Sequence, residues 1–259
     1  MRDPGLDEAI RVAGGVGALA RKIGISQPSV SNWLHVPAER VLSVEAATGV
    51  NRASLRPDLY ADRTDLGADL DETDAARARQ YALLSVLLVR APDSTLLDGL
   101  SKLRGDASPL GLAHAALAEA ASATNAERVE REFFDLFIGL GRGELLPYGS
   151  YYLTGFLHER PLARLRETLA RFGIERAEGQ AEPEDHAAIL CEIMAGLISR
   201  RFPAPEGADR ELFEAHLAPW IGRFFADLER AEQGDFYRRI GTLGRMFIEI
   251  ETEAFALPS

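Results

Sequence analysis

Hydrophobic residues recur at helical spacing along nearly the whole chain, and no stretch shows the sustained alternation of apolar and polar residues that is typical of a strand. The segment "ARARQYALLSVLLVR", residues 76–90, is apolar on nearly every side, which predicts a central buried helix. Further helices are expected to start near Pro161, Pro183, Asp209 and Asp235. The pattern therefore predicts an all-α protein.

Another helix is predicted from "TNAERVEREFFDLFIGLG", residues 124–141, because Thr124 and Glu127 have the spacing of a capping box. Its apolar face is expected to hold Val129, Phe133, Leu136, Phe137 and Leu140. The overlapping sequence "GLGRGE", residues 139–144, has three glycines but follows a helix instead of a strand, so we expect a loop and not a nucleotide cradle. The alternative hypothesis that this protein hydrolyses a nucleotide is supported by this segment alone.

The sequence "GALARKIGISQPSVSNWL", residues 17–34, fits two short helices joined by a tight turn. Such a helix-turn-helix needs a small residue between the helices, a residue that tolerates positive φ in the turn, and apolar anchors under the second helix. These requirements are met in order by Ala20, Gly24, Val30 and Trp33. The residues expected to face a DNA major groove are Gln27, Ser31 and Asn32, whose side chains can hydrogen-bond to base edges.

Phosphate contacts would have to come from the flanks of this unit, since its second helix carries no Lys or Arg. The nearest cations are Arg21 and Lys22, followed by Arg40, Arg52 and Arg56. A single copy is therefore expected to bind DNA weakly, and useful affinity would need a homodimer or a partner. The alternative is a helix-turn-helix that serves as a protein-binding module.

The clearest break in composition is "DRTDLGADLDETD", residues 62–74, where six acids accompany one Arg. Mutual repulsion of these charges favours an extended segment. We therefore predict a helix-turn-helix domain at 1–61, an acidic linker at 62–74 and a helical bundle at 75–259. An acidic loop within one domain is the alternative.

Composition narrows the function further. A net charge of −11 argues against a chain that coats nucleic acid along its whole length. The single Cys191 excludes an internal disulfide, and its apolar neighbours predict a buried core thiol. The most apolar run, residues 81–89, is shorter than the roughly 20 residues that span a bilayer, and the first residues do not resemble a secretory signal. We expect a cytoplasmic protein without membrane insertion.

No catalytic constellation is recognisable, and the five His residues are scattered, so we predict no enzyme, catalytic residue, metal site or cofactor. One segment, residues 133–153, carries aromatic side chains with hydroxyl groups, which suit the binding of a peptide. Its exposed residues are predicted to be Pro147, Tyr148, Ser150, Tyr151 and Tyr152. The alternative is that these tyrosines merely cover the core.

A second segment, "AEPEDHAAILCEIMAGL", covers residues 181–197. Pro183 suits a first helical turn, and Glu184 and Asp185 would complement the helix dipole there. His186 is expected one turn into this helix. The motif residues Glu182, Asp185 and His186 would form an acidic, titratable cluster able to receive a cationic peptide, although a core histidine with satisfied hydrogen bonds is the more common case.

These segments resemble two known families. Residues 7–60 are similar to the YdaS/Cro-like helix-turn-helix domains, which implies DNA binding. Within residues 75–255, "EPEDH" resembles the E-P-x-D-H motif of the TorD/DmsD/NarJ redox-enzyme maturation chaperones, and "DLFIGLGRGELLPYGSYYL" resembles that family's aromatic-glycine-proline-tyrosine-serine segment. The second resemblance implies an all-α, TorD-like bundle that binds the N-terminal leader, often a twin-arginine signal, of a molybdopterin-containing oxidoreductase.

Carried over by position, the resemblance implies a leader site formed by Glu182, Pro183, Asp185 and His186, with Tyr148, Ser150 and Tyr151 beside it. The implied partner is the catalytic subunit of a molybdenum enzyme, such as a formate dehydrogenase or a dimethyl sulfoxide/trimethylamine N-oxide reductase-type enzyme. The competing hypothesis is a transcriptional regulator that binds DNA through Gln27, Ser31, Asn32, Arg21 and Lys22 and uses the bundle as its sensor.

Overall fold

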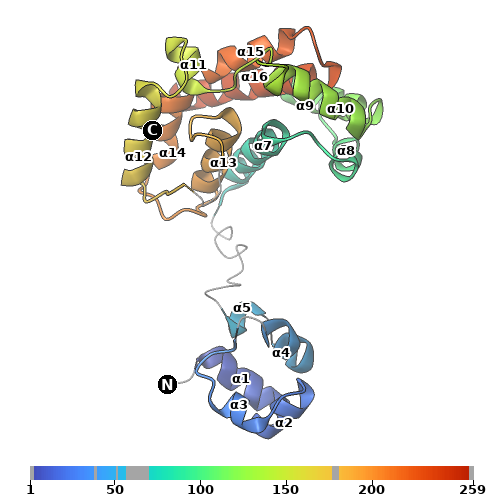
Figure 1. The fold of residues 1–259 in the computed structure, drawn as a ribbon, viewed down its shortest axis with the longest axis vertical. Coiled ribbons are helices and arrows are strands. Elements are labelled where there is room, and N and C mark those ends of the chain that lie inside the picture. The colour runs from blue at the N-terminus through green and yellow to red at the C-terminus, as the bar shows by residue number, and fades with distance from the viewer. Residues whose placement is uncertain (1–2, 38–39, 51, 57–69, 177–180, 257–259) are drawn as a thin grey trace. The chain divides into compact units, whose positions relative to one another are not determined.

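The computed structural model describes residues 3–37, 40–50, 52–56, 70–176 and 181–256. These residues form helices joined by turns and loops, and no sheet occurs among them, so the predicted all-α fold is confirmed. Contacts divide the chain into two compact units, Met1–Asp69 and Leu70–Ser259 (Figure 1). Each unit is described below by itself.

The predicted acidic linker lies largely outside the described residues, which resume at Leu70. Its last residues are helical, because α7 already begins at Glu72. The carboxylate of Asp71 accepts a hydrogen bond of 2.7 Å from the backbone N–H of Asp74 and so caps this helix. The bundle therefore starts a few residues before the predicted position.

The N-terminal unit consists of short helices around one small core. They are α1 (Pro4–Ala13), α2 (Val16–Lys22), α3 (Gln27–Ser31), α4 (Val41–Thr48) and α5 (Arg52–Leu55). Asp3 caps α1 through a 2.8 Å hydrogen bond from the N–H of Gly5. A Cβ atom on Gly5 would lie 1.8 Å from the carbonyl oxygen of Ser54, so only glycine lets α1 and α5 approach this closely.

Helices α2 and α3 form the predicted helix-turn-helix. Ala20 and Val30 are buried between the helices and the core, and Trp33 packs against the same cluster. Gly24 has φ of +71° in the turn, a conformation that favours glycine. The predicted roles of these residues are confirmed by their positions.

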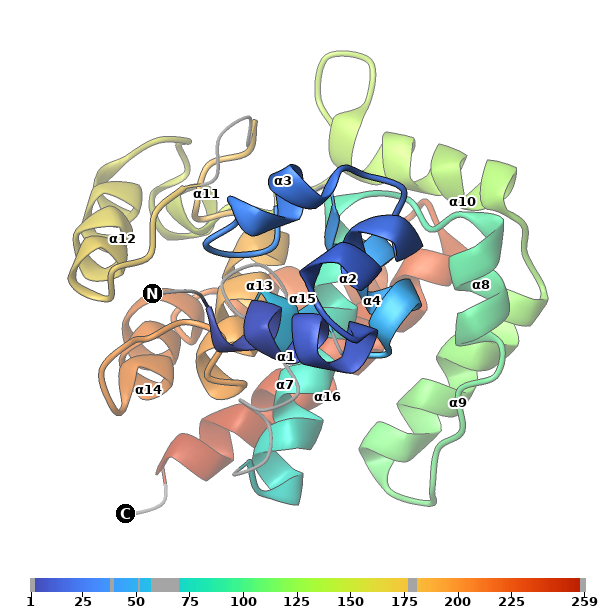
Figure 2. The ribbon, with the colours of Figure 1, turned by 90° about the horizontal axis from the view of Figure 1, so that it is seen from below.

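The C-terminal unit is a bundle of longer helices (Figures 1 and 2). Its elements are α7 (Glu72–Val89), α8 (Ser94–Leu100), α9 (Pro109–Ser122), α10 (Ala126–Phe133), η3 (Phe134–Ile138), α11 (Gly149–Thr154), α12 (Arg160–Arg171), α13 (Ala187–Ile198), α14 (Ala208–Leu212), η4 (Phe213–Leu217), α15 (Ile221–Arg230) and α16 (Asp235–Ala256). The segments η3 and η4 are π-helical turns that continue α10 and α14.

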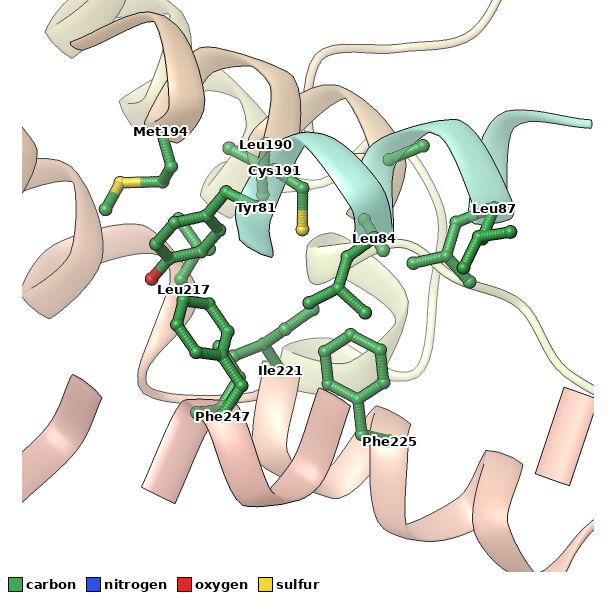
Figure 3. Packing of buried hydrophobic residues seen from close by; sticks show 14 of the residues in the cluster. Tyr81, Leu84, Leu87, Leu190, Cys191, Met194, Leu217, Ile221, Phe225 and Phe247 are labelled. Carbon is green, nitrogen blue, oxygen red and sulfur yellow. The ribbon is translucent and has the colours of Figure 1, made fainter. Parts of the chain in front are cut away.

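The most deeply buried helix is α13, not α7. Every residue of α13 except Glu192 is buried, whereas α7 exposes Val86 and Val89. The two helices pack against each other, and α15 and α16 close the core from the other side (Figure 3). Cys191 lies in this packing, and burial raises the pKa of its thiol to about 12, which confirms an unreactive core residue.

A buried ion pair joins the first turns of α7 to the end of α16. Arg77 donates to both carboxylate oxygens of Glu251, at 2.7 and 2.9 Å, and Glu251 is 1% exposed. Arg77 also donates to Asp74 and lies 3.5 Å from Asp209 on α14. Because several carboxylates share one guanidinium, this cluster fixes three helices relative to one another.

The helix predicted over residues 124–141 differs from expectation at both ends. Asn125, not Thr124, caps α10 by accepting a 3.0 Å hydrogen bond from the N–H of Arg128. The α-helix ends at Phe133, and the π-helical turn that follows keeps Leu136 buried and Phe137 packed against the core before it ends at Ile138. Gly139, with φ of +62°, then turns the chain into the loop, so Leu140, predicted to be on the buried face, is 98% exposed.

Candidate functional site

Two segments distant in sequence meet at a short antiparallel backbone bridge between Tyr148 and His186. The N–H of Gly149 donates to the carbonyl of Asp185 at 2.9 Å, and the N–H of Ala187 donates to the carbonyl of Pro147 at 2.8 Å. The bridge therefore brings the loop before α11 against the "EPEDH" turn before α13. The two segments thus lie side by side, as the family resemblance implied, and together they make the candidate site.

Asp185 is the structural centre of this site. It is 3% exposed, and its Oδ2 accepts a 2.7 Å hydrogen bond from the N–H of Ser150. Since α11 has no side-chain cap of its own, Asp185 supplies one from the other segment. Its second oxygen, Oδ1, is buried and has no hydrogen-bond partner among the described residues.

His186 is the N-cap of α13, and not a residue one turn into that helix as the sequence pattern suggested. Its Nδ1 accepts a 3.1 Å hydrogen bond from the N–H of Ala188, which requires an unprotonated nitrogen. Burial lowers the pKa of His186 to about 4, although Glu182 and Asp185 oppose the shift. At neutral pH His186 is therefore uncharged, so in the predicted cluster it acts as an N-cap and not as a cation.

The outer part of the site is made by tyrosine and glutamate. Tyr148 donates a 2.5 Å hydrogen bond from its hydroxyl to Glu182, and its ring lies edge-on to His186 with the ring centroids 5.1 Å apart. Burial and the contact with Glu182 raise the pKa of Tyr148 above its usual range, so the phenol keeps its proton. Glu184, next in the motif, accepts two hydrogen bonds from Arg166 on α12.

A pocket of about 220 Å³ opens beside Asp185, between α11, α12 and η4. Its wall is formed by Gly149, Leu153, Pro161, Arg164, Leu165, Asp185, Ala215 and His216. Arg164 is exposed at this pocket, whereas Asp185 is buried. The pocket thus combines apolar walls with one buried carboxylate and one cation, and sequence reasoning identified only the carboxylate.

The remaining predicted site residues lie around this centre. Ser150 is fully buried, so the prediction that it is exposed is wrong. Pro183 lies half-buried in the turn before α13, and the "EPEDH" acids precede this helix instead of forming its first turn. Tyr151 is half-buried and accepts a 2.5 Å hydrogen bond from Arg142, which also lies over its ring. Nothing in the sequence singles out three arginines at this site, because their contacts depend on which helices meet in the fold. They are Arg142, Arg164 and Arg166.

In the N-terminal unit all five predicted DNA-binding residues are exposed, which any contact with DNA requires: Gln27, Ser31, Asn32, Arg21 and Lys22. Gln27 begins α3, Ser31 ends it and Asn32 follows it. Gln27 lies over α2, where a Cβ atom on Gly17 would be 3.2 Å from its Oε1. Of the flanking cations, Arg56 donates to the carbonyl of Val36 at 2.8 Å.

The described residues contain no group of three or more His, Cys, Asp or Glu side chains arranged to hold a metal ion. Among the same residues, no helix is both long and apolar enough to cross a membrane. The "GLGRGE" segment forms part of the loop between η3 and α11, as predicted.

Together, the fold and the site define a helix-turn-helix unit joined to an all-helical bundle whose site is built on a bridged "EPEDH" turn. Residues 104–226 match the family described as nitrate reductase delta subunit, and residues 6–64 match the family described as bacterial toxin YdaS. The resemblance of the bundle to the TorD/NarJ family, and of the N-terminal unit to YdaS-like domains, is thereby confirmed.

Similar curated proteins carry the name chaperone protein TorD. The chain is 25% identical to the Vibrio atlanticus protein over 135 residues, covering 48% of this chain and 63% of the relative. It is 28% identical to a Vibrio cholerae protein over 127 residues, which cover 46% of this chain and 58% of that relative. The match thus spans less than two thirds of these two relatives. The chain is 24% identical to the Shewanella loihica protein over 210 residues, which cover 71% of this chain and 96% of that relative.

Proposed function

We propose that this protein is a cytoplasmic maturation chaperone that binds the N-terminal leader of a molybdopterin-containing oxidoreductase before cofactor insertion. Support comes from the similarity of the bundle to proteins named TorD chaperones. The client's leader, often a twin-arginine signal, would present adjacent cations followed by an apolar segment. Its receptor needs carboxylates beside apolar walls.

The observation that carries this proposal is the unpartnered Oδ1 of Asp185 beside the 220 Å³ pocket. A buried carboxylate oxygen without a hydrogen bond is costly, and a charged donor that enters the pocket would remove that cost. A guanidinium group is such a donor, and Glu182, which accepts a hydrogen bond from Tyr148 of the bridge, adds a second carboxylate to the site.

The test is calorimetric titration of the full-length chain with synthetic leaders from the molybdopterin-containing oxidoreductases of its own host. We expect one leader to bind, and a version with its arginine pair changed to glutamine to bind much more weakly. Asp185→Asn keeps an oxygen that can cap α11 but removes the charge, so it should weaken leader binding about tenfold or more. Arg164→Gln should strengthen it, because a competing cation is removed from the pocket.

Glu253→Gln on α16 is the matched control, since Glu253 is an exposed carboxylate on another element. It should leave both binding and the thermal midpoint unchanged. Equal affinity of wild type and Asp185→Asn for every leader would contradict the proposed site. Thermal denaturation of each variant separates a binding defect from unfolding.

A second activity, DNA binding, is proposed for the N-terminal unit on the basis of its YdaS match and its exposed polar face. If only Arg21 and Lys22 contact phosphates, the affinity for DNA should fall roughly tenfold between 50 and 200 mM salt. This follows from a slope of about −0.9 per contact in a plot of log affinity against log salt concentration. Fluorescence anisotropy with DNA from upstream of the protein's own gene measures this slope. Binding no tighter than to random DNA would contradict a regulatory role.

A further inference from the structure

The ion pair between Arg166 and Glu184 is built differently from the buried pair at Arg77. Nε and Nη2 of Arg166 donate to the same oxygen of Glu184, Oε2, at 3.0 and 2.8 Å. The Arg166 side chain is 50% exposed, whereas that of Glu184 is 13% exposed. Burial would raise the pKa of Glu184, but the hydrogen bonds from Arg166 outweigh this effect and lower it, so the carboxylate is charged. A largely buried carboxylate is thus neutralised by a guanidinium that remains open to solvent.

Helix α12 is held in the bundle by apolar contacts and not by this ion pair. Its inner face is buried in the core through Leu162, Leu165 and Leu169, which are 1–4% exposed. An ion pair with a half-exposed partner contributes little to stability, because water competes for the charges. The Arg166 side chain can therefore leave Glu184 while its helix stays in place.

This ion pair stands between two pockets beside the "EPEDH" turn. Helix α12 contributes Leu165, just before Arg166, to the 220 Å³ pocket, and Leu169 to a second pocket of about 350 Å³. From the turn, Asp185 lines the first pocket and Glu184 lines the second. Two carboxylates that are neighbours in sequence therefore serve two different pockets.

The second pocket suits a cationic side chain with an apolar stem. Its apolar lining includes Leu169, Ile174, Ile189, Ile193 and Phe202. Its charged lining consists of three carboxylates and one cation: Glu175, Glu184, Glu192 and Arg176. Arg176 donates a 3.0 Å hydrogen bond to the carbonyl of Ala181. An arginine that enters the pocket can bury its methylene groups against the apolar walls while its guanidinium reaches Glu184.

We propose that Arg166 is a built-in competitor of the leader, which occupies Glu184 in the free protein and is displaced by one arginine of the incoming leader. This proposal rests on the proposed function, because its ligand is the same leader. Side chains of adjacent residues in an extended peptide point to opposite sides. An arginine pair laid across the turn therefore places one guanidinium at Asp185 and the other at Glu184, each in its own pocket.

The competitor makes the site selective for a pair of arginines. A peptide with a single arginine neutralises Asp185 and leaves Arg166 on Glu184, so it gains nothing from the second pocket. A peptide with two adjacent arginines gains the second contact, reduced by the free energy of the ion pair that it breaks. Because that ion pair is half-exposed, the reduction is small.

The experiment is calorimetric titration of full-length wild type, Arg166→Gln and Arg171→Gln with a synthetic host leader that contains adjacent arginines. Arg171 is the matched control, since it is exposed on the same helix and pairs with Glu211, outside both pockets. Arg166→Gln should bind the leader about threefold more tightly than wild type, a factor set by the strength of an exposed ion pair. Arg171→Gln changes the net charge equally and should bind as wild type does.

Two further leaders, each with one arginine of the pair changed to glutamine, identify the arginine that displaces Arg166. One of them should bind wild type and Arg166→Gln equally, and its binding should still be weakened by Asp185→Asn. Adding Glu184→Gln to Arg166→Gln should cancel the threefold gain for the intact leader, because the carboxylate that the leader reaches is then neutral.

Equal affinity of wild type and Arg166→Gln for the intact leader, with Asp185→Asn still weakening it, would overturn the inference and leave the proposed function standing. Weaker binding by Arg166→Gln would overturn it as well, because Arg166 would then hold the turn in its binding conformation. An equal gain for Arg171→Gln would do the same, since net charge alone would explain it. If no leader bound wild type, the proposed function would fail, and this inference with it. Thermal denaturation of each variant separates these outcomes from unfolding.

Discussion

Protonation of His186 makes the stability of the bundle depend on pH. The unfolded chain binds a proton at this residue below its ordinary pKa of 6.5, whereas the folded protein does so only near pH 4, because burial disfavours the charged ring. The unfolded state therefore holds more protons between these values, and stability is lost as pH falls through this window. From pH 7 to pH 5 the loss due to His186 is about 2 kcal/mol.

Replacing His186 with Asn isolates this contribution. Asn is a good N-cap, and its side-chain oxygen can accept the hydrogen bond from Ala188, but it does not titrate. The assay is urea unfolding at pH 7 and pH 5 in a Trp33→Phe background, where buried Trp220 is the one tryptophan left to report on the bundle. Wild type should lose about 2 kcal/mol more than the variant between the two pH values.

Other titrating groups cancel in this comparison, including His216, whose pKa burial also lowers. Equal losses of stability in the two proteins would refute the reasoning, because they would mean that the His186 ring is protonated in the folded protein at pH 5. The variant should also be less stable than wild type at pH 7, by about 1 kcal/mol, since it loses the ring contact with Tyr148.

Three further outcomes are expected. Glu251→Gln should lower the free energy of unfolding by about 3 kcal/mol in urea denaturation, because the partly buried guanidinium of Arg77 loses its bidentate partner, a buried carboxylate. Tyr148→Phe should cost only about 1 kcal/mol in the same assay, because Glu182 is partly exposed and can be solvated; a larger cost would show that this hydrogen bond is part of the core. Asn32→Ala should abolish sequence-specific binding in the anisotropy assay without changing the affinity for random DNA, and equal loss on both would contradict base readout.

The helical pattern predicted most of the fold because apolar spacing reports which face of a helix is buried. Starts at Pro161, Asp209 and Asp235 agree with α12, α14 and α16 to within one residue. The pattern failed where the helix ends, since the chain leaves the helical path at Gly139 and Leu140 lies in the following loop, 98% exposed. The glycines of "GLGRGE" mark this loop, but the apolar spacing extended the predicted helix past the first of them.

The sequence predicted which residues the candidate site contains, but not their burial or their hydrogen bonds. The "EPEDH" residues and Tyr148 do meet, yet Asp185 and His186 are buried caps and not an exposed charged surface. Sequence spacing placed His186 inside a helix because a proline at position 183 suits a first turn. Capping across two distant segments depends on tertiary contacts, so neither the role of Asp185 nor the pairing of Glu184 with Arg166 could be read from neighbours in sequence.

Because one turn caps two helices, events at the bridge between Tyr148 and His186 are shared by α11 and α13. A ligand that engages Asp185 will alter the electron density on the oxygen that holds the first turn of α11, and will tighten or loosen that turn. Hydrogen exchange at the backbone N–H of Ser150 therefore becomes an intrinsic reporter of occupancy, available without any label. The same coupling limits how the motif can vary: a substitution at position 185 that improves a ligand contact also changes the end of a helix.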